Sequence, residues 1–399
     1  MLLYHYNLNV NFMKIKLLIL GLVLTLLAGA SYAYAARTNT LPAKGMVVHE
    51  WGTFTTLHAT DGTRLGGLYF DEEQLPRFTY QHGDFTERAD AVYRHKGFDI
   101  SPTNEPKNVT IKMETPVIYF YSKKAQNATV QVDFPQGIIS QWYPQNTSGN
   151  KMNDNWDFTK PYKGGMKWKV KVLPPNSTTK LTPPKEEETE VWTSPRAVDA
   201  NLVQSHKGEV EKFIFYRGVA NFSIPVETKF TSDNELLVKN TGQHTLPKVF
   251  VYEKKADGSE NLWWSDEMKS GAEQKINFVT EQPTKADFTA FEQALVAAGL
   301  YEKEAKAMLA TWEESYFKHT GLRVFWIVPE ENVNKLLPLK ISPKPTETKR
   351  VFVGRVDLLT PAFERELQKN FERNGRLTGY IGDRYYKAYS ERMEQLNKK

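Results

Sequence analysis

Long runs of β-branched and aromatic residues are the feature that most constrains how this chain folds. Two such runs occupy residues 47–57 and 111–122, and two shorter segments, 128–134 and 166–172, alternate apolar and polar positions. In 166–172 the apolar side chains fall on one face and three lysines on the other, as in a strand with one buried face. Pro116 inside the second run implies a sheet edge or a β-bulge there. The sequence therefore predicts half-buried sheets.

The predicted elements change along the chain and divide it into successive regions. Residues 37–173 predict an N-terminal β domain, 174–190 a linker rich in proline, threonine and glutamate, and 191–283 a second β region. In residues 284–399 apolar side chains recur at helical spacing, and two strand patterns and C-terminal helices follow. We expect a β-rich α+β fold, with two β-sandwich-like regions followed by a helical hairpin that returns to strands.

The N-terminal segment has the composition of a secretory signal peptide. Lys14 and Lys16 precede an apolar run, and an Ala-x-Ala sequence follows at 33–35. This order predicts a signal peptide within residues 1–36, with Met13 as the natural start. The uncharged run is just long enough to span a bilayer, so a retained anchor is the alternative. We expect an exported protein, periplasmic or extracellular, with no membrane span in the mature chain.

Charge and cysteine content exclude several functions. The chain has no cysteine, which rules out thiolate catalysis, zinc ribbons and iron–sulfur ligation. Its formal net charge of +5 falls by two when Lys14 and Lys16 are removed, too little to predict a nucleic-acid partner. The phosphate-binding glycine motifs and the nucleophile-elbow motif are missing, so no cofactor is predicted.

The sequence HEWGTFT at 49–55 is the first candidate for a site. Alternation along a strand places His49 and Trp51 on one face and Glu50 and His58 on the other. Three of these, His49, Glu50 and His58, are the candidate metal ligands, although the spacing differs from that of helical zinc motifs. A core strand with one buried ion pair is the alternative that we favour.

Charged residues inside apolar strand segments form the second candidate. Glu50, Glu114, Arg217, Arg323 and Arg355 each lie among residues that favour burial. A buried charge costs several kcal/mol unless it is paired and hydrogen-bonded, so these side chains are expected to meet counter-ions. They either line a cleft for an anionic or hydroxyl-rich ligand, together with His49 and Trp51, or form ion pairs that hold the fold together.

A catalytic arrangement is the third possibility. Glu50 and Glu114 could act as the acid and base of a glycosidase if their strands are neighbours, because such enzymes need two carboxylates roughly 5–10 Å apart. His319 follows a predicted helix and is a weaker catalytic candidate, since the helix dipole alone favours a histidine there.

Aromatic side chains in polar stretches suggest stacking on sugar rings, although most aromatic residues are simply core. They are Trp142, Tyr143, Trp156, Tyr162, Trp263 and Trp264.

Several stretches together resemble an uncharacterised family of exported bacterial proteins. The resemblance covers most of the mature chain, in the same order, and implies one co-evolved unit without supplying catalytic residues. The stretches are HEWGTFT at 49–55, METPVIYFY at 113–121, FPQGIISQWYP at 134–144, FYRG at 215–218, ESYFKHTGLRVFWIVP at 314–329 and RVFVGRVDLLTP at 350–361.

Three functions follow as hypotheses. The first is an exported binding or cell-envelope protein with a polar-aromatic cleft, whose ligand is a carbohydrate or another envelope component. The second is a hydrolase of polysaccharide or cell-wall material that uses Glu50 and Glu114, or a metal held by histidine and carboxylate. The third is a purely structural envelope component, in which every embedded charge is paired.

Overall fold

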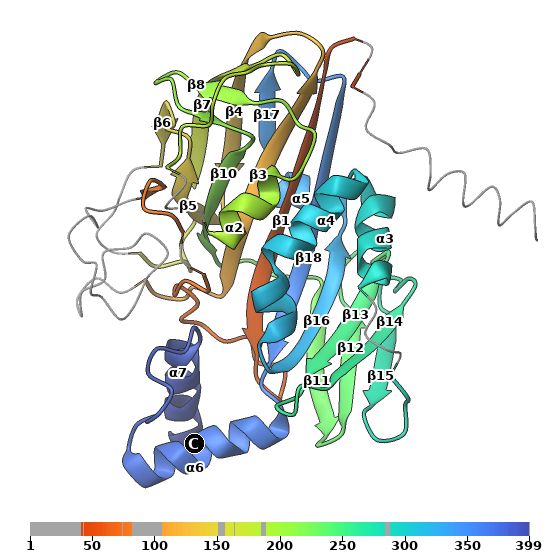
Figure 1. Ribbon diagram of the computed structural model, residues 1–399. Helices are drawn as coiled ribbons and strands as arrows, with labels where there is room; N and C mark the ends of the chain where they lie inside the picture. Colours follow the sequence, from red (N-terminus) through yellow and green to blue (C-terminus); the bar gives the residue numbers. More distant parts are fainter. Residues whose placement is uncertain are drawn as a thin grey trace, which may run out of the picture. The chain divides into compact units, whose positions relative to one another are not determined.

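A nine-stranded sheet forms the centre of the fold (Figure 1). The computed structural model describes residues 41–42, 44–73, 75–81, 106–150, 156–162, 164–184, 189–283 and 288–398, so the predicted signal peptide lies outside the described residues. The strands run in the order β14-β13-β16-β18-β1-β3-β10-β5-β2. Their bounds are β1 Met46–His58, β2 Tyr80–Gln81, β3 Ile111–Ser122, β5 Gly137–Tyr143, β10 Ile214–Ala220, β13 Val249–Lys254, β14 Glu260–Ser265, β16 Gly321–Val328 and β18 Glu347–Leu358.

The pairing at the middle of this sheet joins distant parts of the chain. Strand β1 pairs in parallel with β18 and antiparallel with β3, so an N-terminal strand lies between a C-terminal and an early strand. The register between β1 and β3 shifts between Trp51 and Thr53, because β3 carries one extra residue beside Pro116. The predicted irregularity at Pro116 is thus a bulge in a central strand.

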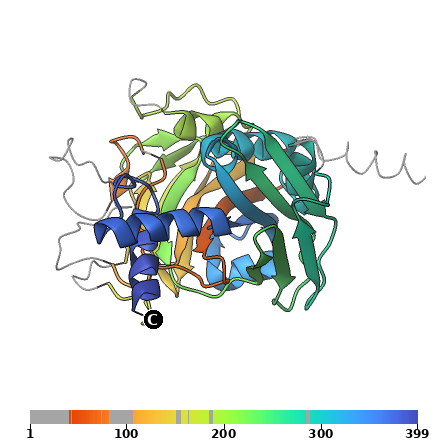
Figure 2. The same ribbon diagram turned by 90° about the horizontal axis from the view of Figure 1, so that it is seen from below.

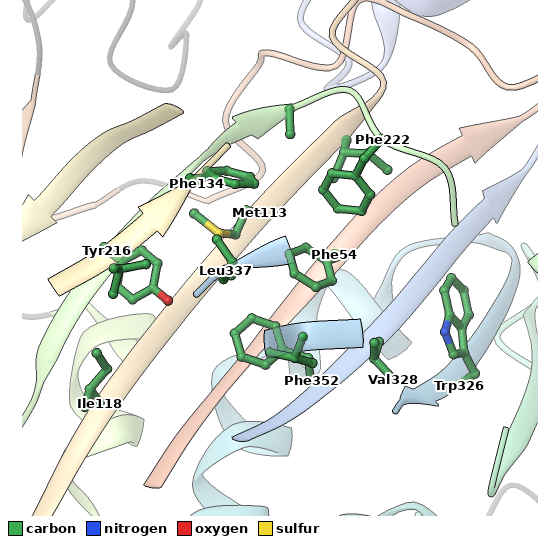
Figure 3. Packing of buried hydrophobic residues seen from close by; sticks show 14 of the residues in the cluster. Phe54, Met113, Ile118, Phe134, Tyr216, Phe222, Trp326, Val328, Leu337 and Phe352 are labelled. Carbon is green, nitrogen blue, oxygen red and sulfur yellow. The ribbon is translucent and has the colours of Figure 1, made fainter. Parts of the chain in front are cut away.

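Two smaller sheets share a hydrophobic core with one face of the central sheet. The core includes Phe54, Met113, Trp326 and Phe352 from the central strands, and Figure 3 shows these rings and aliphatic groups together. We call this face the apolar face. The six-stranded sheet contains β17 Leu339–Ser342, β4 Gln126–Phe134, β7 Gly164–Val172, β8 Val203–Ser205, β9 Val210–Glu211 and β6 Ser148–Gly149; the three-stranded sheet contains β11 Val226–Ser232, β12 Glu235–Asn240 and β15 Glu273–Asn277.

Helices cover parts of the opposite face (Figures 1 and 2). One cluster of buried side chains, the helix cluster, joins Trp51 and Val353 to helices α3 and α4. A second, the C-terminal cluster, joins Leu57 and Leu359 to helices α6 and α7. The helices are α2 Glu190–Thr193, η2 Ser194–Arg196, α3 Thr289–Ala298, α4 Glu302–Thr311, η3 Glu314–Lys318 (a π-helical turn), α5 Glu330–Leu336, α6 Pro361–Asn374 and α7 Tyr386–Asn397.

The β-rich α+β class predicted from the sequence is confirmed, and the helical hairpin α3–α4 returns to strands as expected. The segment from Leu41 to the C-terminus forms one compact unit, and the central sheet takes strands from each of the three predicted regions. The sequence-based boundaries therefore fall within one unit. Within the described ranges, no helix has both the length and the apolar character that a membrane crossing requires.

Candidate functional site

A band of polar side chains crosses five adjacent central strands on the helix-covered face. We call it the polar belt, and its members are Arg323 on β16, Arg355 and Asp357 on β18, Thr53 and Thr55 on β1, Lys112 and Glu114 on β3, and Arg217 on β10. All are buried, with at most 6% of any of these residues exposed.

The belt separates the helix cluster from the C-terminal cluster. On β10, Phe215 belongs to the helix cluster and Val219 to the C-terminal cluster, and Arg217 lies between them on the same face. Val353 on β18 and Leu359, directly after that strand, flank the belt in the same way. Charge therefore interrupts what would otherwise be one continuous apolar surface.

Residues 71–73, which we call the acidic segment, bring three carboxylates onto the belt. The Asp71 Oδ1 atom lies 2.7 Å from Arg217 Nη2, and Arg217 Nη1 lies 4.0 Å from Glu114 Oε2. The remaining Arg217 nitrogen, Nε, donates a hydrogen bond to Gln141 Oε1. Arg217 is thus held by two carboxylates and one amide, as a buried guanidinium requires.

Glu72 is one of two acids of the site, with Asp357, that lie near several donors. Its Oε2 atom lies 2.9 Å from Arg355 Nη1 and 3.5 Å from Arg384 Nη1. Its Oε1 atom lies 3.3 Å from Lys112 Nζ and 3.1 Å from the Tyr385 hydroxyl. Only 1% of the Glu72 side chain is exposed, so its negative charge is balanced almost entirely by these donors.

Asp357 links three guanidinium groups. Its Oδ1 atom lies 3.0 Å from Arg323 Nε and 3.6 Å from Arg384 Nη2, and its Oδ2 atom lies 2.7 Å from Arg355 Nε. Burial opposes ionisation of Asp357, but the charges of Arg355, Arg323 and Arg384 hold its pKa below the ordinary value. Asp357 is therefore an anion at neutral pH.

The charge of Glu73 varies near neutral pH. Burial first, and then the carboxylates of Glu72 and Glu114, raise the pKa of Glu73 to about 7, although Arg355 and Arg217 act in the opposite direction. Near pH 7 this side chain exchanges a proton with solvent.

The belt reaches solvent near Arg384 and His319. The Arg384 side chain is 14% exposed, more than any other cation in contact with Glu72, and His319 is exposed at the end of η3. Partial burial, followed by the charges of Arg384 and Arg323, lowers the pKa of His319, which places this ring near the cationic end of the site. His319 thus lies at the margin of the belt, where the charges of Arg384, Arg323 and Glu72 act on its ring.

The structure brings together four of the residues singled out in the sequence. Glu114, Arg217, Arg323 and Arg355 all belong to the polar belt, and each lies near an oppositely charged group. Glu50 does not join them. The bulge beside Pro116 shifts the pairing by one residue, so Glu114 points to the face opposite that of Glu50.

Glu50 forms a separate ion pair on the apolar face. Its Oε2 atom lies 2.5 Å from Arg350 Nε, and Tyr216 donates a hydrogen bond to its Oε1 atom. Arg350 also donates to the Asn334 side chain and to the Leu337 carbonyl. Neither side chain of the pair is more than 1% exposed. The strands that carry Glu50 and Glu114 are neighbours, as the glycosidase hypothesis required, but the two carboxylates do not face one cleft.

The other candidates of the first strand also lie apart. His49 Nδ1 lies 2.7 Å from Glu304 Oε2, which joins β1 to α4, and Trp51 is fully buried in the helix cluster. His58 Nδ1 lies 2.8 Å from Thr228 Oγ1 on β11. His49, Glu50 and His58 thus have three different partners, and the described residues contain no group of three His, Asp or Glu side chains placed to hold a metal.

The aromatic residues proposed for stacking are mostly core. Trp142, Tyr143, Trp156 and Trp263 are buried, and Tyr162 and Trp264 are half-buried. Two surface depressions, of about 460 and 450 Å³, lie beside β11, α6 and α7 and on β4 and β7, and no belt residue lines either one.

Sequence reasoning missed half of the site. Lys112 and Asp357 lie in the same apolar runs as Glu114 and Arg355, two positions away, and alternation would have placed them on the same face. The acidic segment and Arg384 lie in polar surroundings, where charges are normally solvated, so no local signal marks them. The C-terminal helix was expected, but not its contribution of Arg384 and Tyr385.

Comparisons with known proteins give no relative from which a function could be transferred. No protein-family model matches the chain, and no curated protein matches it. Among solved structures, the yeast delta-COP-I mu-homology domain complexed with the Dsl1 WxWxV peptide aligns with a TM-score of 0.26 at 6% identity, covering 79% of this chain and 97% of that one. The same domain without the peptide gives 0.28 at 5% identity, covering 81% and 98%. At these scores the likeness carries no argument.

Proposed function

We propose that this chain is an exported binding protein whose ligand is anionic and is held at the polar belt. One observation carries the proposal. Among the described residues, five cations lie at the belt, whereas the carboxylates that the strands place there are Glu114 and Asp357. The cations are Lys112, Arg217, Arg323, Arg355 and Arg384. Guanidinium groups of this kind bind carboxylate, phosphate or sulfate groups in a bidentate manner.

Stability alone does not account for this arrangement. Buried ion pairs are often no more stabilising than well-packed apolar residues of similar volume, because desolvation offsets the attraction between the charges. Apolar residues at the belt would join the helix cluster and the C-terminal cluster into one core. Charges that interrupt a core in this way favour a binding site, as perturbed ionisable groups often do.

The proposed export is supported by the sequence of residues 1–36 and by the resemblance to an exported bacterial family. It is tested by expressing the full chain in a Gram-negative bacterium and sequencing the N-terminus of the protein recovered from the periplasm. We expect a mature chain that begins just after the Ala-x-Ala sequence at 33–35. A cytoplasmic protein with an intact N-terminus would contradict export.

Ligand binding is tested by calorimetry at low salt with citrate, inorganic phosphate, an acidic oligosaccharide and a neutral oligosaccharide of equal length. We expect saturable binding of at least one anion and none of the neutral sugar, with affinity that falls as ionic strength rises. Arg384→Gln should abolish binding, because this partly exposed cation lies where solvent reaches the belt. Arg365→Gln, on α6 and paired with Asp233 outside the belt, is the matched control.

A structural envelope component is the second candidate. It is favoured by the pairing of Glu114, Arg217, Arg323 and Arg355 with carboxylates and cations of the chain itself. It predicts that none of the four probes binds and that Arg384→Gln changes stability only. The hydrolase hypothesis loses its acid pair, since Glu50 and Glu114 lie on opposite faces of the sheet.

A further inference from the structure

We propose that the Glu72 carboxylate is an internal anion that occupies a ligand subsite of the polar belt and leaves it when an external anion binds. The inference rests on the proposed function and gives it a mechanism: the ligand competes with a part of the chain. It also names the subsite, a pocket for one carboxylate or phosphate group.

The geometry around Glu72 is that of a bound ligand. Donors from three separate parts of the fold converge on its two oxygens: Lys112 from β3, Arg355 from β18, and Arg384 from the segment just before α7. The Tyr385 hydroxyl lies between Glu72 and Asp357, at 3.1 and 2.8 Å. The strand donors are fixed by the central sheet, and β18 also holds Asp357, which positions Arg355 and Arg384. The donors would keep this arrangement if Glu72 left, because none of them depends on Glu72 for its backbone position.

Glu72 itself comes from a segment without regular structure. Residues 70–73 form neither helix nor strand, whereas Glu114 and Asp357 lie within strands. The chain just before them is anchored, because Leu65, Leu68 and Tyr69 are buried in the C-terminal cluster. Segments of this kind open at lower free energy than the sheet to which they are attached. The displaceable acids of the site are therefore the three of the acidic segment, and the fixed acids are those of the strands.

The charges of the site are consistent with displacement. The five cations at the belt outnumber Glu114 and Asp357 by three, and the acidic segment supplies three acids to match them. The third acid fits poorly, since burial and the neighbouring Glu72 and Glu114 raise the pKa of Glu73 to about 7. An external anion that replaced the segment would relieve this repulsion and keep the cations paired.

The first test is rescue of Glu72→Ala, which removes the internal carboxylate and leaves room for a small one. Formate and acetate are the probes, with chloride at equal ionic strength as the salt control. We expect a lowered Tm that rises saturably with formate or acetate, and citrate affinity about tenfold or more above that of the wild type. Glu50→Ala is the matched control: its ion pair lies on the apolar face and should not be rescued. A variant that gains no more from formate than from chloride would overturn the inference.

The second test uses the wild-type chain and so does not depend on whether the variant folds. Hydrogen exchange of the peptide covering residues 65–73 is measured with and without citrate. We expect faster exchange in the bound protein, because the segment has left the belt, and slower or unchanged exchange would overturn the inference. If citrate binds the wild type but exchange in 65–73 is unchanged, the internal anion fails and the proposed function stands. If no anion binds the wild type while formate rescues Glu72→Ala, the subsite stands and the proposed function fails.

Discussion

The two faces of the central sheet use the same strand segments in opposite ways. On the apolar face, Phe54 and Met113 pack in a continuous hydrophobic core. On the other face, their immediate neighbours Thr53, Lys112 and Glu114 contribute to the polar belt. The backbone is shared, so the difference lies only in which side chains the alternation sends to each face.

The two faces of the sheet also differ in how their buried charges are paired. On the apolar face Glu50 and Arg350 form one closed pair, supported by Tyr216. In the polar belt Arg217, Arg355 and Asp357 each have more than one counter-ion, and some of these come from a segment without regular structure. The first arrangement is a fixed ion pair, whereas for the second we propose that the carboxylate of Glu72 exchanges with a ligand.

The closed pair on the apolar face should be the most sensitive to mutation. Glu50→Leu leaves the Arg350 guanidinium buried without its carboxylate, and we expect a loss of about 3–5 kcal/mol in the free energy of unfolding. Urea denaturation measures the loss. The double variant Glu50→Leu/Arg350→Leu should lose less than either single variant, because no unpaired charge remains. If the double variant lost as much stability as a single variant, or the sum of the two single losses, the unpaired charge would not be the cause of the loss.

His58 should make the apolar face sensitive to acid. Burial and the charge of Arg64 lower the pKa of His58 to about 4, so the unfolded chain binds this proton more tightly than the folded one. Stability is therefore lost as the pH falls from the unfolded value of about 6.5 to about 4. The loss from this group is about 3 kcal/mol. His58→Gln should flatten the pH dependence of urea denaturation in this window. His206→Gln, at an exposed position, should leave it unchanged.

Glu73 should give the polar belt the opposite response. Its folded pKa of about 7 lies above the ordinary value of 4.5, so its contribution to stability is complete at acid pH and is lost as the pH rises between these values. At pH 8, Glu73→Gln should be more stable than the wild type by about 1–2 kcal/mol after allowance for solvent screening. At pH 4 the two should be equal. A wild type that is the more stable at pH 8 would contradict the cause assigned here, while the exposed Glu394→Gln serves as control.

The smallest effect is expected outside both faces. Arg365 and Asp233 form an ion pair with both side chains more than half exposed. Surface pairs of this kind contribute little, because water and salt screen them. Arg365→Gln should leave the urea midpoint unchanged within error. A clear loss would mean that charge pairing in general, rather than burial at the belt, determines stability in this chain.

Much of the secondary structure could be predicted from local pattern. The strands that became β1, β3, β7 and β18 were evident from β-branched and aromatic residues, and Thr360, Pro361 and Gly375 mark the ends of α6. The pairing was not predictable in this way. That β1 lies between β3 and β18 depends on contacts between residues about 300 positions apart, for which local pattern contains no signal.

For the site, the sequence by itself determined that Glu50, Glu114, Arg217, Arg323 and Arg355 must be buried and paired. A charged side chain inside an apolar strand destabilises the fold by several kcal/mol unless it is paired with an opposite charge. Only the tertiary structure decided which partners they meet. One extra residue beside Pro116 turns Glu114 away from Glu50, and the folding of residues 71–73 and Arg384 onto the sheet completes the polar belt. The reason is physical: burial follows from local composition, whereas the choice of counter-ion depends on register and on distant segments.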